Sequence, residues 1–206
     1  MARKSNDLDK KMLRAGALLL RKGGLSTFSV RDVTKKANVN LGMFNYHFGN
    51  KDNFIKRLLD EAYTPFILDL ESHRSQDNGL EEILFRMACF SRDHSESLLH
   101  LLADSLSHEK NVVHFLKSNF TQHFAILQDA ITAYFEVNNY PSGAKDHAFR
   151  FLIAAVGLPN VMSSLRVKFM PSKTTQLDND EALRRRVRAA LAGLSILCST
   201  TQKSPP

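Results

Sequence analysis

Tryptophan is absent from the chain of 206 residues, and cysteine occurs only twice, as Cys89 and Cys198. Both cysteines have mainly apolar neighbours in the sequence. Two such residues support neither a disulfide framework nor a zinc site built from paired cysteines. This sparing use of cysteine favours a reducing compartment.

Long hydrophobic runs are also missing. The longest uncharged stretch of the C-terminal half covers the fifteen residues 151–165 and contains a proline, an asparagine and two serines. It is too short and too polar to span a membrane. The apolar run at residues 15–20 is short, is followed by Arg21 and Lys22, and lacks a small-residue cleavage site. We therefore expect a cytoplasmic protein without a signal peptide.

Negative charge is scarce in the N-terminal part. Residues 1–60 hold thirteen Lys and Arg against five Asp and Glu, a net charge of +8, whereas residues 61–206 hold fifteen against sixteen, a net charge of −1. The whole excess behind the formal net charge of +7 therefore lies in the first sixty residues. This asymmetry is typical of a basic module that binds a polyanion, joined to a near-neutral module with another task.

Apolar residues recur at helical spacing along most of the chain, and no convincing alternating strand pattern is present. The pattern predicts an all-α fold. Pro159 should kink or split the helix in which it lies. The expected helices cover residues 7–22, 29–36, 40–48, 51–73, 80–92, 95–106, 109–135, 142–168 and 178–199.

Local signals mark the ends of the first helices. Gly23 and Gly24 can supply a left-handed cap where the first helix stops. Ser29, with Asp32 three positions later, is a variant of the capping box, and Asn40 is a natural N-cap for the helix that follows. Two short helices separated by so tight a turn are typical of a helix-turn-helix.

Two neighbouring runs carry a resemblance to a known family. They are SVRDVTKKANV at residues 29–39 and GMFNYHFGNKD at residues 42–52. This region, roughly residues 8–59, resembles the N-terminal domain of TetR-family transcriptional repressors. The resemblance implies a three-helix DNA-binding domain at residues 1–50 and a larger helical domain for ligand binding and dimerisation at residues 51–206.

The resemblance also implies the partners. They are double-stranded DNA with a palindromic operator, a second copy of the chain, and a small-molecule inducer that releases the DNA. A dimer is expected on physical grounds too, because one short helix reads few base pairs while two related helices read a palindrome. The helix that starts at Lys51 joins the two domains, and we expect it to transmit the effect of ligand binding to the DNA-binding domain. The operator, the inducer and the direction of regulation stay open.

The outward face of the second short helix should enter the major groove. There Asn45 can bond to a base edge, and Leu41 and Met43 can contact a thymine methyl group. Tyr46 and His47 resemble the family's backbone-contacting pair. The residues that we expect to contact DNA are Ser29, Arg31, Asn40, Leu41, Gly42, Met43, Asn45, Tyr46, His47 and Lys51. The alternative for these is a solvated surface, and for Gly42 it is close packing against the preceding helix.

Four positions depart from the family pattern, two of them being Leu41 and Met43, which replace commoner polar residues. Asn38 stands where the family usually has glycine, and asparagine tolerates the left-handed conformation that such a turn needs. Asn45 stands where the family usually has tyrosine. We therefore expect that the operator of a relative cannot be transferred to this chain.

The last helices carry an apolar stripe that could form half of a four-helix dimer interface. The alternative is that the stripe packs within the chain. The residues that we expect at the interface are Phe149, Leu152, Ile153, Val156, Leu183, Val187, Ala190, Leu191 and Leu194.

Aromatic residues in the near-neutral part could line an apolar ligand pocket, although ordinary core packing is the alternative for each of them. The candidate lining residues are Phe85, Cys89, Phe90, Phe120, Phe124 and Phe149. No cofactor is expected.

A rival function rests on histidines. His100, Asp104 and His108 are spaced four apart, as metal ligands on one helical face can be. Amphipathicity of the same helix explains this stripe equally well, so no metal site is expected. The alternative function is a non-specific nucleic-acid-tethered interaction protein, or a metal-dependent enzyme that uses residues 94–123. No set of nucleophile, base and orienting residue is present, and we do not expect an enzyme.

Overall fold

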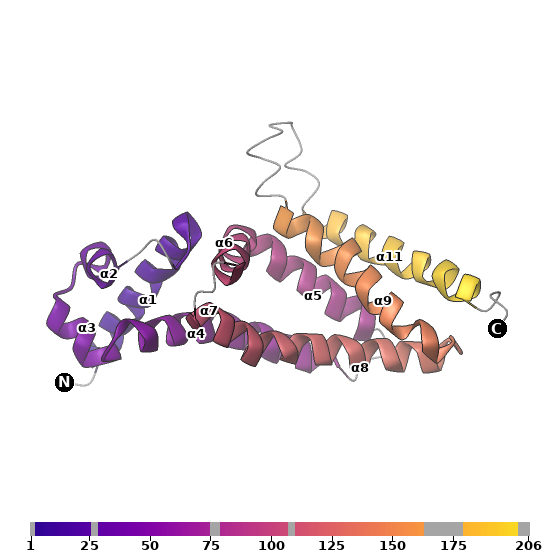
Figure 1. Ribbon diagram of the computed structural model, residues 1–206, viewed down its shortest axis with the longest axis horizontal. Coiled ribbons are helices and arrows are strands. Elements are labelled where there is room, and N and C mark those ends of the chain that lie inside the picture. Colours follow the sequence, from indigo (N-terminus) through magenta and orange to yellow (C-terminus); the bar gives the residue numbers. More distant parts are fainter. Residues whose placement is uncertain (1–2, 26–28, 75–78, 107–109, 163–178, 202–206) are drawn as a thin grey trace, which may run out of the picture. The chain divides into compact units, whose positions relative to one another are not determined.

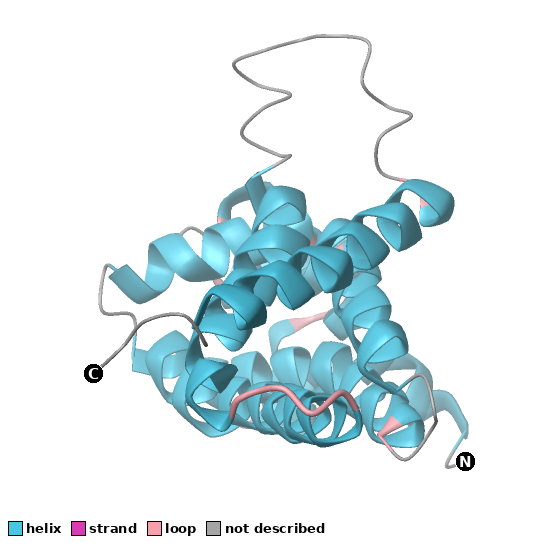
Figure 2. Ribbon diagram, turned by 90° about the vertical axis from the view of Figure 1, so that its right-hand side faces the viewer, coloured by secondary structure: helices cyan, strands magenta, loops and turns pink. Residues whose placement is uncertain are grey.

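The structure, a computed structural model, describes residues 3–25, 29–74, 79–106, 110–162 and 179–201, and every regular element in these ranges is helical (Figures 1 and 2). The predicted all-α class is confirmed. The longer helices are α1 (Arg3–Gly23), α2 (Val30–Ala37), α3 (Leu41–Phe48), α4 (Lys51–His73), α5 (Gly79–Asp93), α6 (Ser95–Leu106), α7 (Lys110–Phe115), α8 (Thr121–Val137), α9 (Lys145–Leu152) and α11 (Asp180–Thr201). Shorter turns are η1 (Leu116–Phe120), η2 (Ser142–Ala144) and η3 (Ile153–Gly157). Among the described helices, none is both long and apolar enough to cross a membrane.

Two compact units make up the chain. The first comprises Met1–Pro65 and Glu96–Phe120, and the second comprises Phe66–Ser95 and Thr121–Pro206. This division differs from the expected boundary at residue 50 for two reasons. Helix α4 continues across Pro65 without a break, and α6 is grouped with the N-terminal helices.

Three phenylalanine rings form the centre of the first unit. Phe44 and Phe48 of α3 and Phe54 of α4 have ring centroids between 4.9 and 5.3 Å apart. All three are buried, as are Met12 of α1 and Val33 of α2. Burial of each such side chain contributes about 1.5–3 kcal/mol, so this core holds α3 against its neighbours.

The end signals of the first helices are present in the structure. Gly24 has a φ of 78°, and its amide donates to the carbonyl of Leu20 at 2.9 Å, which gives α1 its left-handed cap. Ser29 and Asp32 make both hydrogen bonds of the predicted capping box. Asn38 adopts the left-handed conformation with a φ of 54°, as predicted for the turn between α2 and α3.

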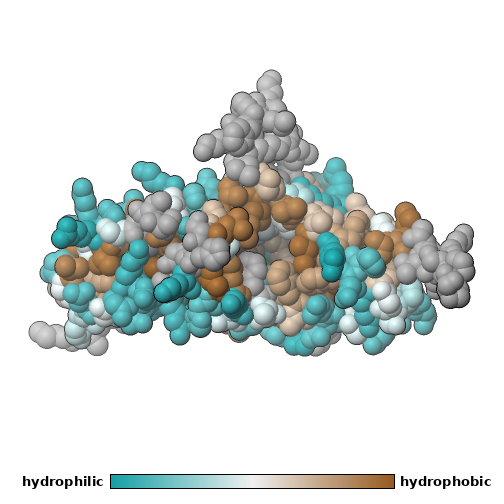
Figure 3. All heavy atoms as spheres, in the orientation of Figure 1, coloured by the Kyte–Doolittle hydropathy of each residue, from teal (hydrophilic) through white to brown (hydrophobic). Residues whose placement is uncertain are grey.

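In the second unit, α5 packs against α8, η3 and α11, and α11 packs also against α9. The inward side of α5 consists of apolar and small residues, and so does that of α11. The buried residues of these two helices include Leu80, Ile83, Leu84, Phe85, Ala88, Leu183, Val187, Ala190 and Leu194. The face that Figure 3 presents is mixed: hydrophobic side chains gather along its middle, and hydrophilic ones lie mostly around them.

Ion pairs join α5 to α11. They are Glu81 with Arg188 at 3.0 Å, Glu82 with Arg184 at 3.0 Å, and Arg92 with Asp180 at 2.6 Å. Burial acts to raise the pKa of Glu82, but the hydrogen bond and charge of Arg184 hold that pKa below its ordinary value. The order of these pairs shows that α5 and α11 run in opposite directions.

The expected helix at residues 142–168 is irregular. It begins with η2, continues as α9, widens into the π-helical turn η3 and resumes at residues 158–162; the remainder lies outside the described residues. Pro159 has no amide proton for the carbonyl of Ala155, and that carbonyl lies within η3. The helix is therefore not split at Pro159, and the π-helical turn η3 precedes the proline.

The start of α11 needs a correction. The sequence favours Asp178 as its first residue, but α11 begins at Asp180. The side chain of Asn179 accepts a hydrogen bond from the amide of Ala182 at 2.8 Å and so acts as the cap. Asp178 lies outside the described residues.

Candidate nucleic-acid interface

Helix α3 presents one buried and one exposed face. The side chain of Asn40 accepts a hydrogen bond from the amide of Met43 at 2.8 Å, which fixes the start of the helix as predicted. Phe44 and Phe48 anchor the inner face in the core. The outer face carries four exposed residues that the sequence proposes as DNA contacts, namely Leu41, Gly42, Asn45 and Tyr46.

The surroundings of Gly42 separate its two interpretations. A Cβ atom at this position would meet only Oδ1 of Asn40, at 3.3 Å, within a radius of 4 Å. Close packing against the preceding helix is therefore wrong as an explanation. The glycine leaves a bare stretch of backbone on the exposed face, where another molecule can approach closely.

The outer face of α3 combines polar and apolar groups of the kinds that can contact base edges in a major groove. Tyr46 is 77% exposed and Leu41 is 49% exposed, which is far more than an intramolecular role would leave. Asn45 adds an exposed amide with both donor and acceptor atoms. Met43 is half-buried, so only part of its side chain can take part in a contact.

His47 has one ring nitrogen inside the protein. In the described part of the chain, its Nε2 is buried and has no hydrogen-bond partner. The ring lies edge-on to Tyr46, with centroids 5.2 Å apart. A phosphate contact from His47 would therefore have to come from Nδ1.

Three further candidates flank α3. The hydroxyl of Ser29 donates to Asp32 at 2.7 Å, and these hydrogen bonds lower the pKa of Asp32. Ser29 therefore has its only donor engaged in the cap, which leaves it little to offer a phosphate. Arg31 is exposed on the first turn of α2, and Lys51 is half-buried at the first position of α4.

An ion pair behind α3 has no signal in the sequence. The guanidinium of Arg57 on α4 donates to the carboxylate of Asp9 on α1 at 2.6 Å. The same guanidinium lies 5.7 Å from the ring centroid of Phe48 at the end of α3. Asp9 and Arg57 are 48 positions apart on different helices, so no spacing rule could have paired them.

Most residues expected at a dimer interface are buried inside the second unit. Six have an exposed fraction of 5% or less, namely Leu152, Val156, Leu183, Val187, Ala190 and Leu194. A side chain that its own chain covers has no surface left for a partner. The interface prediction is therefore wrong for these six, which pack within the chain. The half-buried residues Phe149, Ile153 and Leu191 stay predicted contacts.

The six candidate lining residues of a ligand pocket do not form one group. The guanidinium of Arg184 lies 3.7 Å from the ring centroid of Phe85, so Phe85 faces α11. Cys89 is one helical turn further on the same side of α5, and burial raises the pKa of its thiol. Phe85 and Cys89 are therefore corrected to helix-packing residues. The side chain of Phe120 lies outside the described residues.

The other candidates belong to a cluster that we call the aromatic cluster. Phe66 stacks on Phe90 with ring centroids 4.0 Å apart, and His123 lies 6.0 Å from Phe66. Phe124 lies 4.1 Å from His123 and 5.6 Å from Phe149. The aromatic cluster thus consists of Phe66, Phe90, His123, Phe124 and Phe149.

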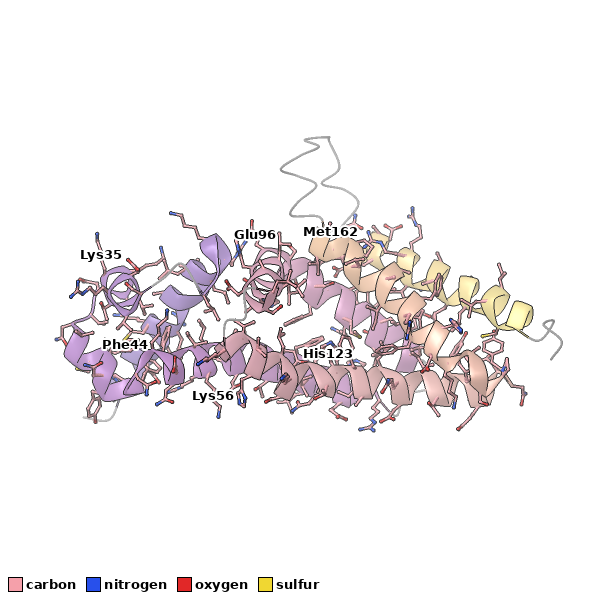
Figure 4. All side chains as sticks on the ribbon, viewed as in Figure 1. Lys35, Phe44, Lys56, Glu96, His123 and Met162 are labelled. Carbon is pink, nitrogen blue, oxygen red and sulfur yellow. The ribbon has the colours of Figure 1, made fainter. Side chains whose placement is uncertain are left out.

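His123 was missed as a member of this cluster (Figure 4). Burial lowers its pKa to about 4, so the ring is neutral at ordinary pH. Its spacing of three, four and seven positions from Ile126, Leu127 and Ala130, all buried, is the signal that could have placed it inside.

Two of the three possible metal ligands, His100 and Asp104, lie within the described residues. Asp104 is buried, and its carboxylate accepts a hydrogen bond from the amide of Leu25 at 2.7 Å. His100 is half-buried, and His108 lies outside the described residues. Within the described ranges, no group of three or more His, Cys, Asp or Glu residues could hold a metal ion.

Comparisons with known proteins agree with this architecture. Residues 12–58 match the family model described as bacterial regulatory proteins, tetR family. The chain is 24% identical over 133 residues to the probable HTH-type transcriptional regulator YttP of Bacillus subtilis, which covers 63% of this chain and 58% of that protein. The match thus spans less than two thirds of that relative's length.

Solved structures extend the similarity of fold over nearly the whole chain. A TetR transcription regulator from Haloarcula marismortui superposes with a TM-score of 0.67 at 15% identity, over 95% of this chain and 98% of that chain. A transcriptional regulator from Aquifex aeolicus gives a TM-score of 0.65 at 16% identity, over 91% and 99%. The match to the tetR family of bacterial regulatory proteins thus covers the larger part of α1, α2, α3 and the first part of α4, and the fold of the whole chain is similar to that of solved TetR regulators.

Proposed function

We propose that the chain is a transcriptional repressor that binds a palindromic DNA operator as a homodimer and leaves it when a small molecule binds. The observation that carries the proposal is the exposed outer face of α3, where Leu41, Gly42, Asn45 and Tyr46 have no role in the core. The net charge of +8 in residues 1–60 supports a polyanionic partner. A regulator of this family acts on DNA and not on a chemical bond, and we place it in the cytoplasm.

The contacts divide by chemistry into reading and positioning. Asn45, Leu41 and Met43 carry groups that distinguish base edges, so we assign them to reading. Arg31, Tyr46, His47 and Lys51 carry donors suited to phosphates, so we assign them to positioning. Asn40 has its Oδ1 engaged at the amide of Met43 and can use its side-chain amide donor in addition. The Ser29 side chain caps α2, so we do not assign it a contact with DNA.

Dimerisation is assigned to the outer side of the last two helical segments. Leu158 is 51% exposed, Met162 is 45% exposed and Ile196 is 67% exposed, in contrast to the buried stripe on the inner side. Exposed Ala189 and Ala192 of α11 would let a second helix approach closely. Two copies would then present two α3 helices to half-sites about 34–36 Å apart, or a multiple of that spacing.

Ligand release is assigned to the second unit. The aromatic cluster offers apolar surface with one neutral polar ring, which suits a largely apolar small molecule. Phe66 of this cluster lies on α4, the same helix that begins at Lys51 beside α3. A ligand can weaken DNA binding only by its differential affinity for the two conformations, and α4 is the element through which we expect that difference to act.

Selection followed by a salt titration tests the function. Wild-type protein is used to select palindromes from a pool of random duplexes. Its affinity for the selected palindrome is then compared with its affinity for random duplexes of equal length. We expect a preference of at least about 1,000-fold, with both affinities falling as salt rises. Equal affinity for both duplexes at every salt concentration would instead support the non-specific tethering protein and refute the proposal.

A further inference from the structure

Asp104 is a buried acidic residue of α6 that the proposed contacts with DNA do not use. It is 5% exposed, and its Oδ2 accepts a hydrogen bond from the amide of Leu25 at 2.7 Å. The two residues are 79 positions apart, and Leu25 is itself 1% exposed. A buried charged acceptor needs such donors, because an ionised carboxylate without them is costly to bury.

The end of α1 explains why a donor is available there. Gly24 closes α1 with a bond from its amide to the carbonyl of Leu20. This form of helix end leaves the next amide, that of Leu25, without the intrahelical partner that a Schellman motif would give it. Asp104 supplies the missing acceptor from another helix.

The fit at this turn is tight. A Cβ atom on Gly24 would lie 2.8 Å from Oδ2 of Asp104, so a larger residue would push the carboxylate away. The positive φ of Gly24 requires glycine for a second reason. Backbone and carboxylate are therefore shaped to each other at the point where the chain leaves α1 for α2.

A second link between α1 and α6 is weaker. Arg21 pairs with Glu96 at 3.1 Å, but both side chains are more than half exposed. Solvent and salt screen such a pair, and its contribution is small. Of these two contacts, the buried bond from Leu25 is therefore the stronger link between α6 and the end of α1.

We infer that Asp104 is a positioning residue for DNA reading: through the amide of Leu25, α6 completes the DNA-binding unit by fixing the end of α1, which packs against α2 and α3. This inference rests on the proposed function, since it assigns α6 a task in presenting α3. It also predicts a physical property, slow exchange of the Leu25 amide proton, that needs no DNA.

Substitutions test both levels in the full-length protein. Asp104→Asn removes the charge with little change of shape, and Asp104→Ala removes the acceptor. Gly24→Ala should displace the carboxylate of Asp104 without any substitution at position 104. Asp146→Asn, at an exposed position of α9, is the matched control. We measure hydrogen exchange of ¹⁵N-labelled Leu25 and the affinities for selected and random duplexes at one salt concentration.

We expect exchange at Leu25 to accelerate about tenfold or more in Asp104→Ala, because a hydrogen bond to a charged group is lost. Affinity for the selected duplex should fall about tenfold in all three variants, while affinity for random duplexes stays within about twofold. A variant that merely unfolded in part would lose both affinities equally.

Several results overturn the inference. Unchanged exchange at Leu25 in Asp104→Ala would show that the contact is not made in solution. Faster exchange with unchanged preference for the selected duplex would show that the contact does not position α3. Failure of all three variants to fold would reduce Asp104 to a stability residue. A wild-type protein without preference between duplexes would refute the proposed function, and the exchange measurement would still decide whether the contact exists.

Discussion

Nη2 of Arg57 on α4 donates to Oδ2 of Asp9 on α1 at 2.6 Å, and the two residues form a bridge between α1 and α4. The Asp9 side chain is only 8% exposed, whereas that of Arg57 is 50% exposed. Arg57 also covers the ring of Phe48, which ends α3. The guanidinium of Arg57 thus links α4 to both α1 and α3. A planar group suits these two contacts better than an ammonium would.

Replacing Arg57 by Met should destabilise the protein, because the carboxylate of Asp9 stays buried without its partner. Breaking a fully buried pair costs about 3–5 kcal/mol, and since Arg57 is half exposed we expect about 2 kcal/mol. Urea unfolding at pH 7 measures the change. The double variant Asp9→Asn with Arg57→Met should recover part of the loss. Strictly additive effects of the two substitutions would show that the pair contributes no coupling.

The division of α3 contacts into reading and positioning leads to opposite DNA-binding phenotypes. Lys51→Ala should weaken binding to all sequences and reduce the slope of log K against log salt by about 0.9. Asn45→Ala and Met43→Ala should keep the slope and change which bases are preferred. Affinity profiles over single-base variants of the selected palindrome provide the measurement. If Lys51→Ala and Asn45→Ala gave the same profile, the division would be wrong.

The local features of the fold could be predicted from sequence because their causes are local. The capping box at Ser29 and the left-handed turn at Asn38 depend on residues within four positions of each other. Apolar periodicity likewise predicts which face of α11 is buried, but it does not say whether the chain itself or a second copy covers that face. This is why Leu183, Val187 and Leu194 were assigned to a partner, although they pack against the chain's own helices.

The features that could not be predicted all join distant positions. Asp9 with Arg57, and Asp104 with Leu25, depend on how helices far apart in sequence meet. The spacing of His100, Asp104 and His108 suggested metal ligands only because a helical face looks the same whether it faces an ion or another helix. Of the candidate DNA contacts, the exposed ones on α3 follow from the motif, and their assignment to bases or phosphates stays a prediction.

The dimer surface can be tested with one charged substitution. Ile196 is 67% exposed on α11, so Ile196→Asp should leave the folded chain intact while placing a charge in the proposed interface. We expect a monomer by light scattering at concentrations where the wild type is a dimer, together with loss of palindrome binding. Val137→Asp, at an 81% exposed position of α8, is the control and should stay dimeric. A dimeric Ile196→Asp variant with full affinity would place the interface elsewhere.

Asn160 is a buried polar residue whose removal should be costly. It is fully buried, its side-chain amide donates to the carbonyl of Ala88 and to Ser91, and its Oδ1 accepts from Arg186 at 2.7 Å. Asn160→Ala should lower the free energy of unfolding by about 2–3 kcal/mol, since the acceptors and the guanidinium lose a partner in a buried site. Urea unfolding compares it with Asn138→Ala, whose exposed bond to the carbonyl of Tyr134 should cost far less. Equal losses in both variants would contradict the role of burial.

His123 makes the free energy of unfolding depend on pH. Burial lowers its pKa to about 4 from an ordinary value of 6.5, so between these two pH values the unfolded chain binds a proton that the folded protein does not. The contribution of His123 is therefore fully present above pH 6.5 and falls as the pH drops toward 4. At pH 5 the loss relative to pH 7 should be about 2 kcal/mol.

Urea unfolding of wild type and of His123→Phe at both pH values isolates this effect, because other groups titrate alike in the two proteins. The variant should lose about 2 kcal/mol less than the wild type on acidification, and the control His147→Gln, at an exposed position, should behave like the wild type. Equal losses in wild type and His123→Phe would mean that His123 takes up its proton in the folded protein as readily as in the unfolded chain.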